Sequence, residues 1–120
     1  MKIYTGYYGG LKHYTNLCCV SISLYQPRWL QRFPVCRVLA PKPWILKLKD
    51  DPEKYTEEYH KLLQELDPVE IIRWLESISE GKDVVLLCYE KPGQFCHRRL
   101  VANWLKETLE LEILEYEIPS

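Results

Sequence analysis

The sequence contains no run of apolar residues that approaches the roughly 20 needed for a membrane-spanning helix. Residues 1–5 are also too short and too polar to form the apolar region of a signal peptide. Internal repeats and low-complexity segments are missing as well. We therefore expect a soluble, cytoplasmic protein that does not associate with a membrane.

The cysteines do not form a set that is typical of a disulfide-bonded secreted domain. There are five of them, an odd number, and their spacing is irregular. A reducing compartment keeps such cysteines as thiols. We therefore predict free thiols at all five positions, which are Cys18, Cys19, Cys36, Cys88 and Cys96.

Several familiar catalytic motifs are also missing. The sequence has no GxxxxGK[ST] phosphate loop, no GxGxxG and no GxSxG nucleophile elbow. A cysteine phosphatase or rhodanese loop would place an arginine six residues after its cysteine, but the residue six positions after Cys88 is Gln94. Seven residues separate Cys88 from Cys96, and no second CxxC completes a zinc-binding set, so we predict no metal site. No motif in the sequence indicates a particular cofactor, so the cofactor is unknown at this point.

What is present indicates one globular domain over residues 1–120. A chain of this length buries roughly two thirds of the surface that its unfolded form exposes, which is enough for one core. Apolar residues make up 47% of the sequence and aromatic residues 12%, a composition typical of folded proteins.

Charge is divided unevenly along the chain. Residues 1–49 contain eight Lys or Arg and no Asp or Glu, whereas residues 50–120 contain eight basic and seventeen acidic residues. The basic first part favours an anionic ligand or nucleic acid as a partner. The alternative is that the two parts neutralise each other within one domain.

Hydrophobic patterns predict strands that alternate with helices. Apolar or alternating stretches indicate strands near residues 2–5, 17–23, 83–88 and 111–118, and residues 33–49 are expected to be irregular, with a short strand at 35–39. Asp-Pro pairs indicate the starts of helices at residues 51 and 67, and a third helix is expected over about 96–109. This order predicts an α/β domain of three layers, in which helices flank a mostly parallel sheet. Ligands of such folds bind at the carboxyl ends of the strands.

The segment LLCYEKPGQFCHRRLVANWL, residues 86–105, joins a buried strand to a helix through a Pro-Gly turn. Cys88 ends the strand and Cys96 falls in the first turn of the helix. Unpaired backbone amides make this end of a helix partially positive, which favours an anion or a thiolate. The alternative for both cysteines is that they are small core residues.

The polar residues of this segment are candidates for chemistry or binding. Cys96 is a candidate nucleophile, Glu90 a candidate general base or a partner that orients His97, and His97 a candidate for proton transfer near neutral pH. Arg98 is a candidate bidentate anchor for phosphate or carboxylate. We expect Arg99 to be a solvated surface charge. Loop hydrogen bonding is the alternative for His97, and exposure to solvent is the alternative for Glu90.

The same segment, VVLLCYEKPGQFCHRRLVANWL in full, resembles the carboxyl-terminal signature of the family catalogued as domain of unknown function 488. The resemblance covers Cys88, Glu90, Cys96, His97 and Arg98. The opening IYTGYYGG and the Tyr55 and Tyr59 pair are also similar to that family. One departure is that VSISLYQPRW contains no acidic residue where many members have Asp-Val-Arg after the second strand. The resemblance implies an α/β fold with a pocket around these residues, but no established reaction.

The leading hypothesis is a small enzyme or ligand-binding domain that takes a small anionic, nucleotide-like or phosphate-bearing molecule. The predicted catalytic residues are Cys96, Glu90 and His97. The predicted ligand-binding residues are Arg98, Cys88, Thr5, Gly6, Tyr7, Ser21 and Ser23. An alternative is a noncatalytic nucleic-acid module that uses the basic, aromatic first 49 residues. A third hypothesis, a redox sensor, requires the sulfurs of Cys88 and Cys96 to meet. The sequence does not predict an oligomeric state.

Overall fold

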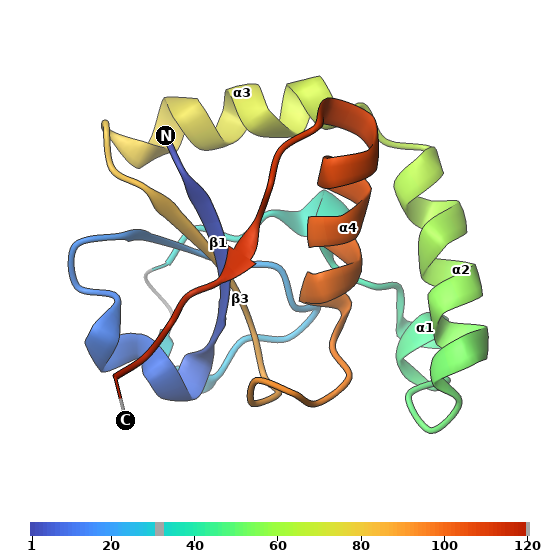
Figure 1. Ribbon diagram of the computed structural model, residues 1–120. Coiled ribbons are helices and arrows are strands. Elements are labelled where there is room, and N and C mark those ends of the chain that lie inside the picture. The colour runs from blue at the N-terminus through green and yellow to red at the C-terminus, as the bar shows by residue number, and fades with distance from the viewer. Residues whose placement is uncertain (31–32, 120) are drawn as a thin grey trace.

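The computed structural model describes residues 1–30 and 33–119, and in this part of the chain the strands form one four-stranded, all-parallel sheet (Figure 1). Its order is β2-β3-β1-β4. The strands are β1 (Ile3–Tyr7), β2 (Cys18–Ser21), β3 (Val84–Cys88) and β4 (Leu114–Glu115). Arg32, one of the eight basic residues of the first part, lies outside the described residues.

Strand β3 is central and is buried along its whole length. It pairs with β1 on one side, where Tyr7 lies opposite Cys88, and with β2 on the other, where Ser21 lies opposite Leu87. A strand with neighbours on both sides and cover on both faces is a continuous apolar run, as the sequence VVLLC is. The register brings the carboxyl ends of the three strands to one edge of the sheet, and the predicted parallel α/β fold is confirmed.

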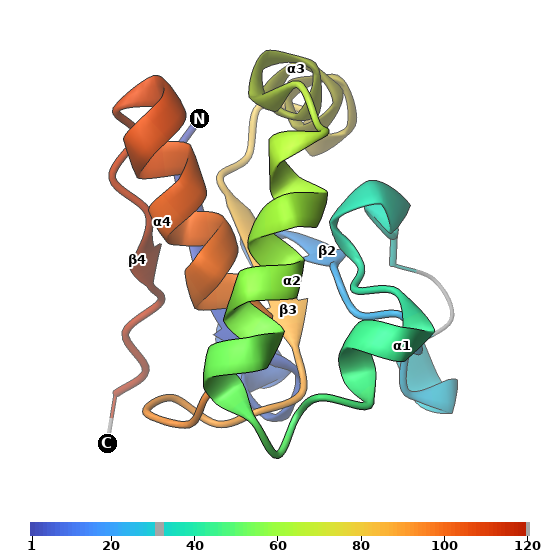
Figure 2. The ribbon, with the colours of Figure 1, turned by 90° about the vertical axis from the view of Figure 1, so that its right-hand side faces the viewer.

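Four α-helices in the described residues cover the sheet: α1 (Pro43–Leu46), α2 (Pro52–Gln64), α3 (Pro68–Ser79) and α4 (His97–Leu109). Asp51 and Asp67 accept hydrogen bonds from the backbone amides of Lys54 and Val69, so the predicted starts of α2 and α3 are confirmed. Figure 2 shows α2 and α4 side by side in front of the sheet. None of the helices in the described residues has both the length and the apolar character needed to cross a membrane.

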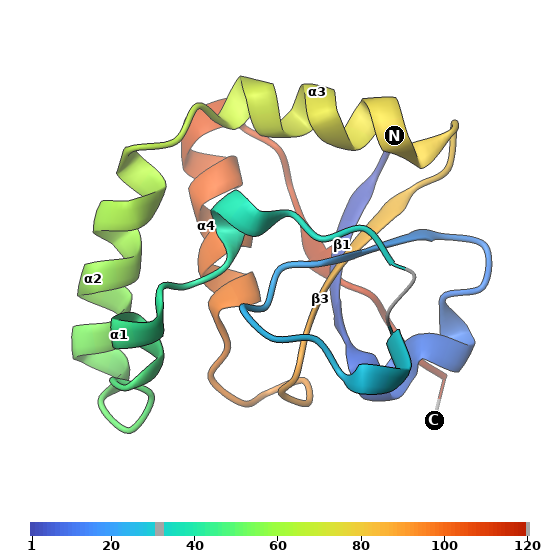
Figure 3. The same ribbon diagram turned by 180° about the vertical axis from the view of Figure 1, so that it is seen from behind.

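The two faces of the sheet are covered by different kinds of structure. The α-helices pack over the larger core, which includes Val20, Leu86 and Leu105. The other face carries a smaller aromatic cluster around Tyr8 and Tyr14, which is covered by the 3-10 helix η1 (Tyr8–His13) and by residues 116–118 (Figure 3).

Two predicted strands differ from the structure. The last strand was expected over residues 111–118, but β4 contains only Leu114 and Glu115. The backbone amide of Tyr116 still donates to the carbonyl oxygen of Thr5 at 2.8 Å, and its ring packs edge-on against that of Tyr14, with the ring centroids 5.3 Å apart. The short strand expected at 35–39 is instead a single bridge between Val35 and Ser21, followed by a 3-10 helix over residues 37–39.

Candidate functional site

A pocket of about 580 Å³ opens where β2 and β3 end and α4 begins. Its position agrees with the rule that parallel sheets bind ligands at the carboxyl ends of their strands. Five of the predicted site residues line it, and these are Ser23, Cys88, Glu90, Cys96 and His97.

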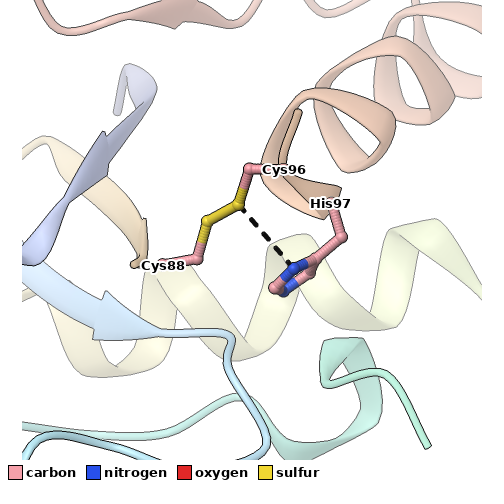
Figure 4. Close-up of side chains that lie close together, drawn as sticks. All are labelled: Cys88, Cys96 and His97. Atoms are coloured by element: carbon pink, nitrogen blue, oxygen red, sulfur yellow. Dashed lines mark hydrogen bonds between the residues drawn. A yellow bond between two sulfur atoms is a disulfide. The ribbon is translucent and has the colours of Figure 1, made fainter. Parts of the chain in front are cut away.

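Cys88 and Cys96 are joined by a disulfide at one end of this pocket (Figure 4). Cys88 is the last residue of β3, and Cys96 is the N-cap residue of α4. The loop between them brings the end of the strand and the start of the helix together, which their spacing in the sequence does not reveal. The prediction of free thiols is therefore wrong for these two cysteines, whereas Cys18, Cys19 and Cys36 are free.

His97 is held in one orientation by the backbone. Its Nε2 atom lies 2.7 Å from the carbonyl oxygen of Ile22, which can only accept a hydrogen bond, so Nε2 carries the proton. Burial lowers the pKa of His97 to about 4, and the Ile22 hydrogen bond opposes this only in part. The ring is therefore neutral near pH 7, and its Nδ1 atom is an acceptor that lies 3.9 Å from the sulfur of Cys96, which has no proton to donate while it is part of the disulfide.

Arg98 is almost fully buried, with 1% of its surface exposed, and most of its donors are engaged within the chain. Its Nε and one terminal nitrogen each donate to a carboxylate oxygen of Glu115 at 2.9 Å. The other terminal nitrogen donates to the sulfur of Cys88 at 3.0 Å and to the carbonyl oxygen of Glu90 at 2.8 Å. Arg98 therefore connects α4, the C-terminal segment and the loop after β3.

Arg99 and Thr5 belong to the same network. Arg99 donates to the hydroxyl oxygen of Thr5 at 2.9 Å and to the carbonyl oxygen of Ile113 at 3.2 Å. The hydroxyl of Thr5 in turn donates to Glu115 at 2.6 Å. The expectation that Arg99 is a solvated surface charge is therefore wrong, because β1 and the residue before β4 bring hydrogen-bond acceptors to this side of α4.

Three other predicted ligand-binding residues lie outside the pocket lining. A Cβ atom at Gly6 would lie 2.6 Å from the hydroxyl oxygen of Tyr14, so this glycine leaves room for a packed ring. The backbone amide of Tyr7 donates to the same hydroxyl at 3.3 Å. Ser21 is hydrogen-bonded to the hydroxyl of Tyr8. In the structure these residues make internal packing contacts.

Ser23 differs from all of these residues because its hydroxyl has no partner. Only 5% of the residue is exposed, and it lies on the pocket wall. Among the side chains that the structure describes, its Oγ is the one buried nitrogen or oxygen atom without a hydrogen bond. Buried polar groups are nearly always hydrogen-bonded, so an unpaired one calls for an explanation.

Glu90 lies at the exposed rim of the pocket, and its backbone carbonyl accepts from Arg98. The group that orients His97 is the carbonyl of Ile22, which sequence reasoning could not identify because a backbone acceptor leaves no signal in the sequence. Sequence reasoning also missed several side chains on the pocket wall, which are Tyr25, Lys47, Lys49, Asp50, Tyr55, Tyr89 and Phe95. The basic character of the first 49 residues was the one signal that pointed toward the two lysines.

The other buried cysteines lie in the packed core. Burial raises the pKa of the Cys19 thiol to about 11 and also raises that of Cys36. These thiols are therefore weak nucleophiles near pH 7. The cysteines that can take part in chemistry at the pocket are Cys88 and Cys96.

Fold and site together define a class: a small parallel α/β protein with a Cys-Cys-His cluster in a pocket at the carboxyl edge of its sheet. Residues 8–109 match the family model DUF488-N3a, described as the active DUF488-N3 subclade. The chain therefore belongs to the DUF488 family, which confirms the resemblance seen in the sequence. No curated protein and no solved structure matches the chain.

Proposed function

We propose that the protein is a small enzyme or ligand-binding domain that binds a small anionic molecule in the pocket between the end of β3 and the start of α4. The ligand is phosphate-bearing or nucleotide-like. The proposal depends on three features: an unpaired buried hydroxyl, a cluster of positive groups, and aromatic surfaces around them.

The unpaired hydroxyl of Ser23 is the single observation that carries the proposal. A hydroxyl buried without a partner costs about 1–3 kcal/mol, so a fold does not keep one without compensation. A bound ligand with an oxygen acceptor supplies the missing hydrogen bond. Because Ser23 lies on the wall of the pocket, rotation of its side chain would bring the hydroxyl, whose oxygen is itself buried, to a molecule inside the pocket.

Positive groups around the pocket favour an anion. No side chain caps the first turn of α4, so its amides keep their partial positive charge. Lys47 and Lys49 add two full positive charges on the wall, and Asp50 and Glu90 balance them in number, so the lysines offer local contacts for an anion while the helix amides supply the remaining positive charge. Helix amides and lysines are common ligands of phosphate groups.

Aromatic side chains on the wall favour a ligand with a planar part. Tyr25, Tyr89 and Phe95 are exposed there, and the ring of Phe95 packs edge-on against the buried ring of Tyr55. Stacking of a base on such rings is worth about 1–3 kcal/mol per base. This supports a nucleotide-like ligand over inorganic phosphate alone.

In this proposal the reacting end of the pocket is formed by Cys96, His97 and Glu90. The first two lie together, with the neutral Nδ1 of His97 facing the sulfur, and Glu90 supplies a carboxylate at the rim. The matched subclade is described as active, which is in line with a reacting centre. Arg98 has the role of positioning Cys88 and the loop, since its donors are turned to internal partners.

Thr5, Gly6, Tyr7 and Ser21 stay predictions as ligand contacts. None of them lines the pocket, so the proposal does not depend on them.

The test is calorimetric titration of the reduced, chelator-treated protein with inorganic phosphate, pyrophosphate and the four common ribonucleoside monophosphates. We expect at least one nucleoside monophosphate to bind more tightly than inorganic phosphate. Ser23→Ala should weaken that binding about 10-fold, because it removes one hydrogen bond to a charged group. Lys47→Ala should weaken it as well, to an extent that shrinks as salt is added.

Matched controls are Ser77→Ala and Lys106→Ala, which remove the same groups from exposed positions on α3 and α4 outside the pocket lining. Both should bind as the unaltered protein does. The proposal is wrong if no probe binds at millimolar concentration, or if the two pocket variants bind every probe as tightly as the controls.

A second candidate function, a nucleic-acid module, is favoured by exposed aromatics in the basic first part. Tyr25, Trp29 and Trp44 are 66%, 69% and 54% exposed, and Arg28 and Lys42 near them are exposed too. In contrast, Tyr8 and Tyr14 of the same part are buried and cannot stack on bases.

Filter binding of a single-stranded oligonucleotide at increasing salt tests this second function. Neutralisation of the backbone predicts an affinity that falls steeply between about 50 and 200 mM salt. Trp29→Ala and Trp44→Ala should then weaken binding. Failure to bind at low salt would exclude it.

A further inference from the structure

The end of the pocket formed by Cys88, Cys96 and His97 has the composition of a metal centre. The two sulfurs and one ring nitrogen lie within 4.8 Å of one another, and all three residues are buried. Figure 4 shows the imidazole facing the sulfur pair. Two thiolates and an imidazole are a ligand set that zinc uses in catalytic sites, with a fourth position open to water or substrate.

The orientation of His97 fits this role. Its Nε2–H is fixed by the carbonyl oxygen of Ile22 at 2.7 Å, so the lone pair of Nδ1 is directed to the side of Cys96. Histidines that bind metals usually donate their other ring nitrogen to a backbone carbonyl or carboxylate in this way. The separation of 3.9 Å between Nδ1 and the Cys96 sulfur is close to the roughly 3.5 Å that tetrahedral zinc bond lengths imply.

The backbone around the two cysteines also has room for an ion. Their Cα atoms are 7.3 Å apart, whereas those of disulfide-bonded cysteines are usually about 4.4–6.8 Å apart. Rotation about the side-chain bonds can therefore move the two reduced sulfurs apart. A terminal nitrogen of Arg98, 3.0 Å from the sulfur of Cys88, donates a hydrogen bond that stabilises a thiolate there.

We propose that the reduced protein binds one zinc ion, or another sulfur-preferring divalent ion, through Cys88, Cys96 and His97, with the fourth position open to the pocket. The disulfide is first reduced to two thiols, either by a dithiol, which is itself oxidised to a disulfide, or by a phosphine and water, which together become the phosphine oxide and supply the two protons. The zinc ion then displaces the two thiol protons and binds both sulfurs and Nδ1.

The metal site deepens the proposed function and shares its pocket. A metal ion at the reacting end would coordinate an anionic oxygen of the ligand, and Cys96 would act as a metal ligand. Metal binding itself needs no organic ligand, so the two can be tested separately. The spacing of Cys88 and Cys96 predicted no metal site, because only the fold brings the strand end, the helix start and the imidazole together.

The first test measures the metal content of the full chain after reduction with a phosphine, incubation with Zn²⁺ and gel filtration. We expect close to one ion per chain. Replacement by Co²⁺ should give the intense near-ultraviolet absorption of thiolate-to-cobalt charge transfer. Cys88→Ser, Cys96→Ser and His97→Gln should each weaken binding by at least about 100-fold, since even partners outside the ligand shell are worth about 10- to 100-fold.

Cys18→Ser is the matched control, because it removes a free, half-buried thiol that is not part of the cluster. It should bind one ion with unchanged affinity. A measurement on the unaltered protein avoids any folding defect of the variants: Zn²⁺ should protect Cys88 and Cys96 from iodoacetamide and leave the labelling of Cys18 unchanged.

The metal site is refuted if the reduced protein retains far less than one ion per chain. It is also refuted if Co²⁺ binds without charge-transfer absorption, or if Zn²⁺ protects neither cysteine of the cluster. Any of these results would leave the binding of nucleoside monophosphates by the chelator-treated protein unaffected. Loss of that binding with an intact metal site would instead refute the anion pocket alone.

Discussion

The polar groups at the carboxyl edge of the sheet form two regions, one on each side of the first turn of α4. One side, formed by Arg98, Arg99, Thr5 and Glu115, is a closed network in which each of these side chains has hydrogen-bond partners in the chain. The other side, the pocket, contains the cysteine pair, the free Nδ1 of His97 and the unpaired hydroxyl of Ser23.

Polar residues with partners in the chain stabilise the fold, whereas polar groups without such partners are available to a ligand. Arg98 is the arginine that the Cys-His-Arg motif suggests as an anion anchor, but its carboxylate partner is Glu115 of the chain itself. The serine that the motif does not include has a buried, unpaired hydroxyl. The charged residues of the motif are thus engaged within the chain, and the unsatisfied hydrogen-bonding capacity lies on the pocket side.

The largest expected contrast is in the reactivity of the cysteines. In reduced, chelator-treated protein a small alkylating reagent should reach Cys96 on the pocket wall. The pKa of Cys19, raised by burial to about 11 from 9.0, lowers its thiolate fraction about 100-fold at neutral pH. Labelling followed by mass spectrometry should therefore find Cys96, which lines the pocket, modified faster than Cys19. The rate at Cys19 should rise with pH up to about 11. Equal rates for the two thiols in the folded state would remove the distinction between pocket and core.

A large loss of stability is expected from breaking the closed network. Glu115→Ala leaves the buried charge of Arg98 without a counter-ion, which should lower the free energy of unfolding by about 3 kcal/mol. Urea denaturation measures this. The double variant Arg98→Met with Glu115→Leu removes both charges and should recover much of the loss. A single variant as stable as the unaltered protein would show that the ion pair does not hold this side together.

A smaller effect is expected from a matched pair of hydroxyl deletions. Thr5→Val removes a buried hydroxyl bonded to Glu115 and Arg99, and should cost about 1–3 kcal/mol. Ser23→Ala removes a hydroxyl that has no partner, so it should leave stability unchanged or raise it slightly while weakening ligand binding. Thermal unfolding of both variants decides the comparison. The contrast between the network and the pocket is contradicted if Ser23→Ala destabilises the protein more than Thr5→Val does.

The smallest effect is expected from an exposed ion pair. On α3 a terminal nitrogen of Arg73 lies 3.2 Å from a carboxylate oxygen of Glu70, and the two side chains are 72% and 65% exposed. Because solvent screens such pairs, Arg73→Ala should change the free energy of unfolding by less than about 0.5 kcal/mol. Urea denaturation of this variant beside Glu115→Ala would show that burial determines the value of an ion pair here. A loss as large as that of Glu115→Ala would contradict this explanation.

Much of the fold could be predicted from local patterns. The Asp-Pro pairs have a direct physical effect at the starts of α2 and α3, and VVLLC predicts a strand buried on both faces. The end of the chain could not be predicted as well, because its alternating pattern fits a long edge strand. In the structure the assigned strand is only two residues long, and the ring of Tyr116 packs on that of Tyr14, a residue about one hundred positions away.

The candidate site was predicted only in part for a similar reason. Cys88, Cys96 and His97 stand out as chemical groups, and a strand followed by a helix start places them at one edge of the sheet. The pairing of Arg98 with Glu115 and the orientation of His97 by Ile22 arise from contacts between distant segments. Such contacts decide which polar groups are left free, and no local motif records them.

The most direct test of the anion pocket is a ¹H–¹⁵N NMR titration of the reduced, chelator-treated protein with the nucleoside monophosphate that binds best in calorimetry. The pocket predicts saturable shifts of the amide signals of Ser23, Cys96 and His97, with smaller changes for Thr5 and Arg99. Ser23→Ala should weaken the apparent affinity in the same experiment. Shifts confined to residues of the basic segment around Trp29 and Trp44, or no shifts at any concentration of the probe, would contradict the pocket as the ligand site.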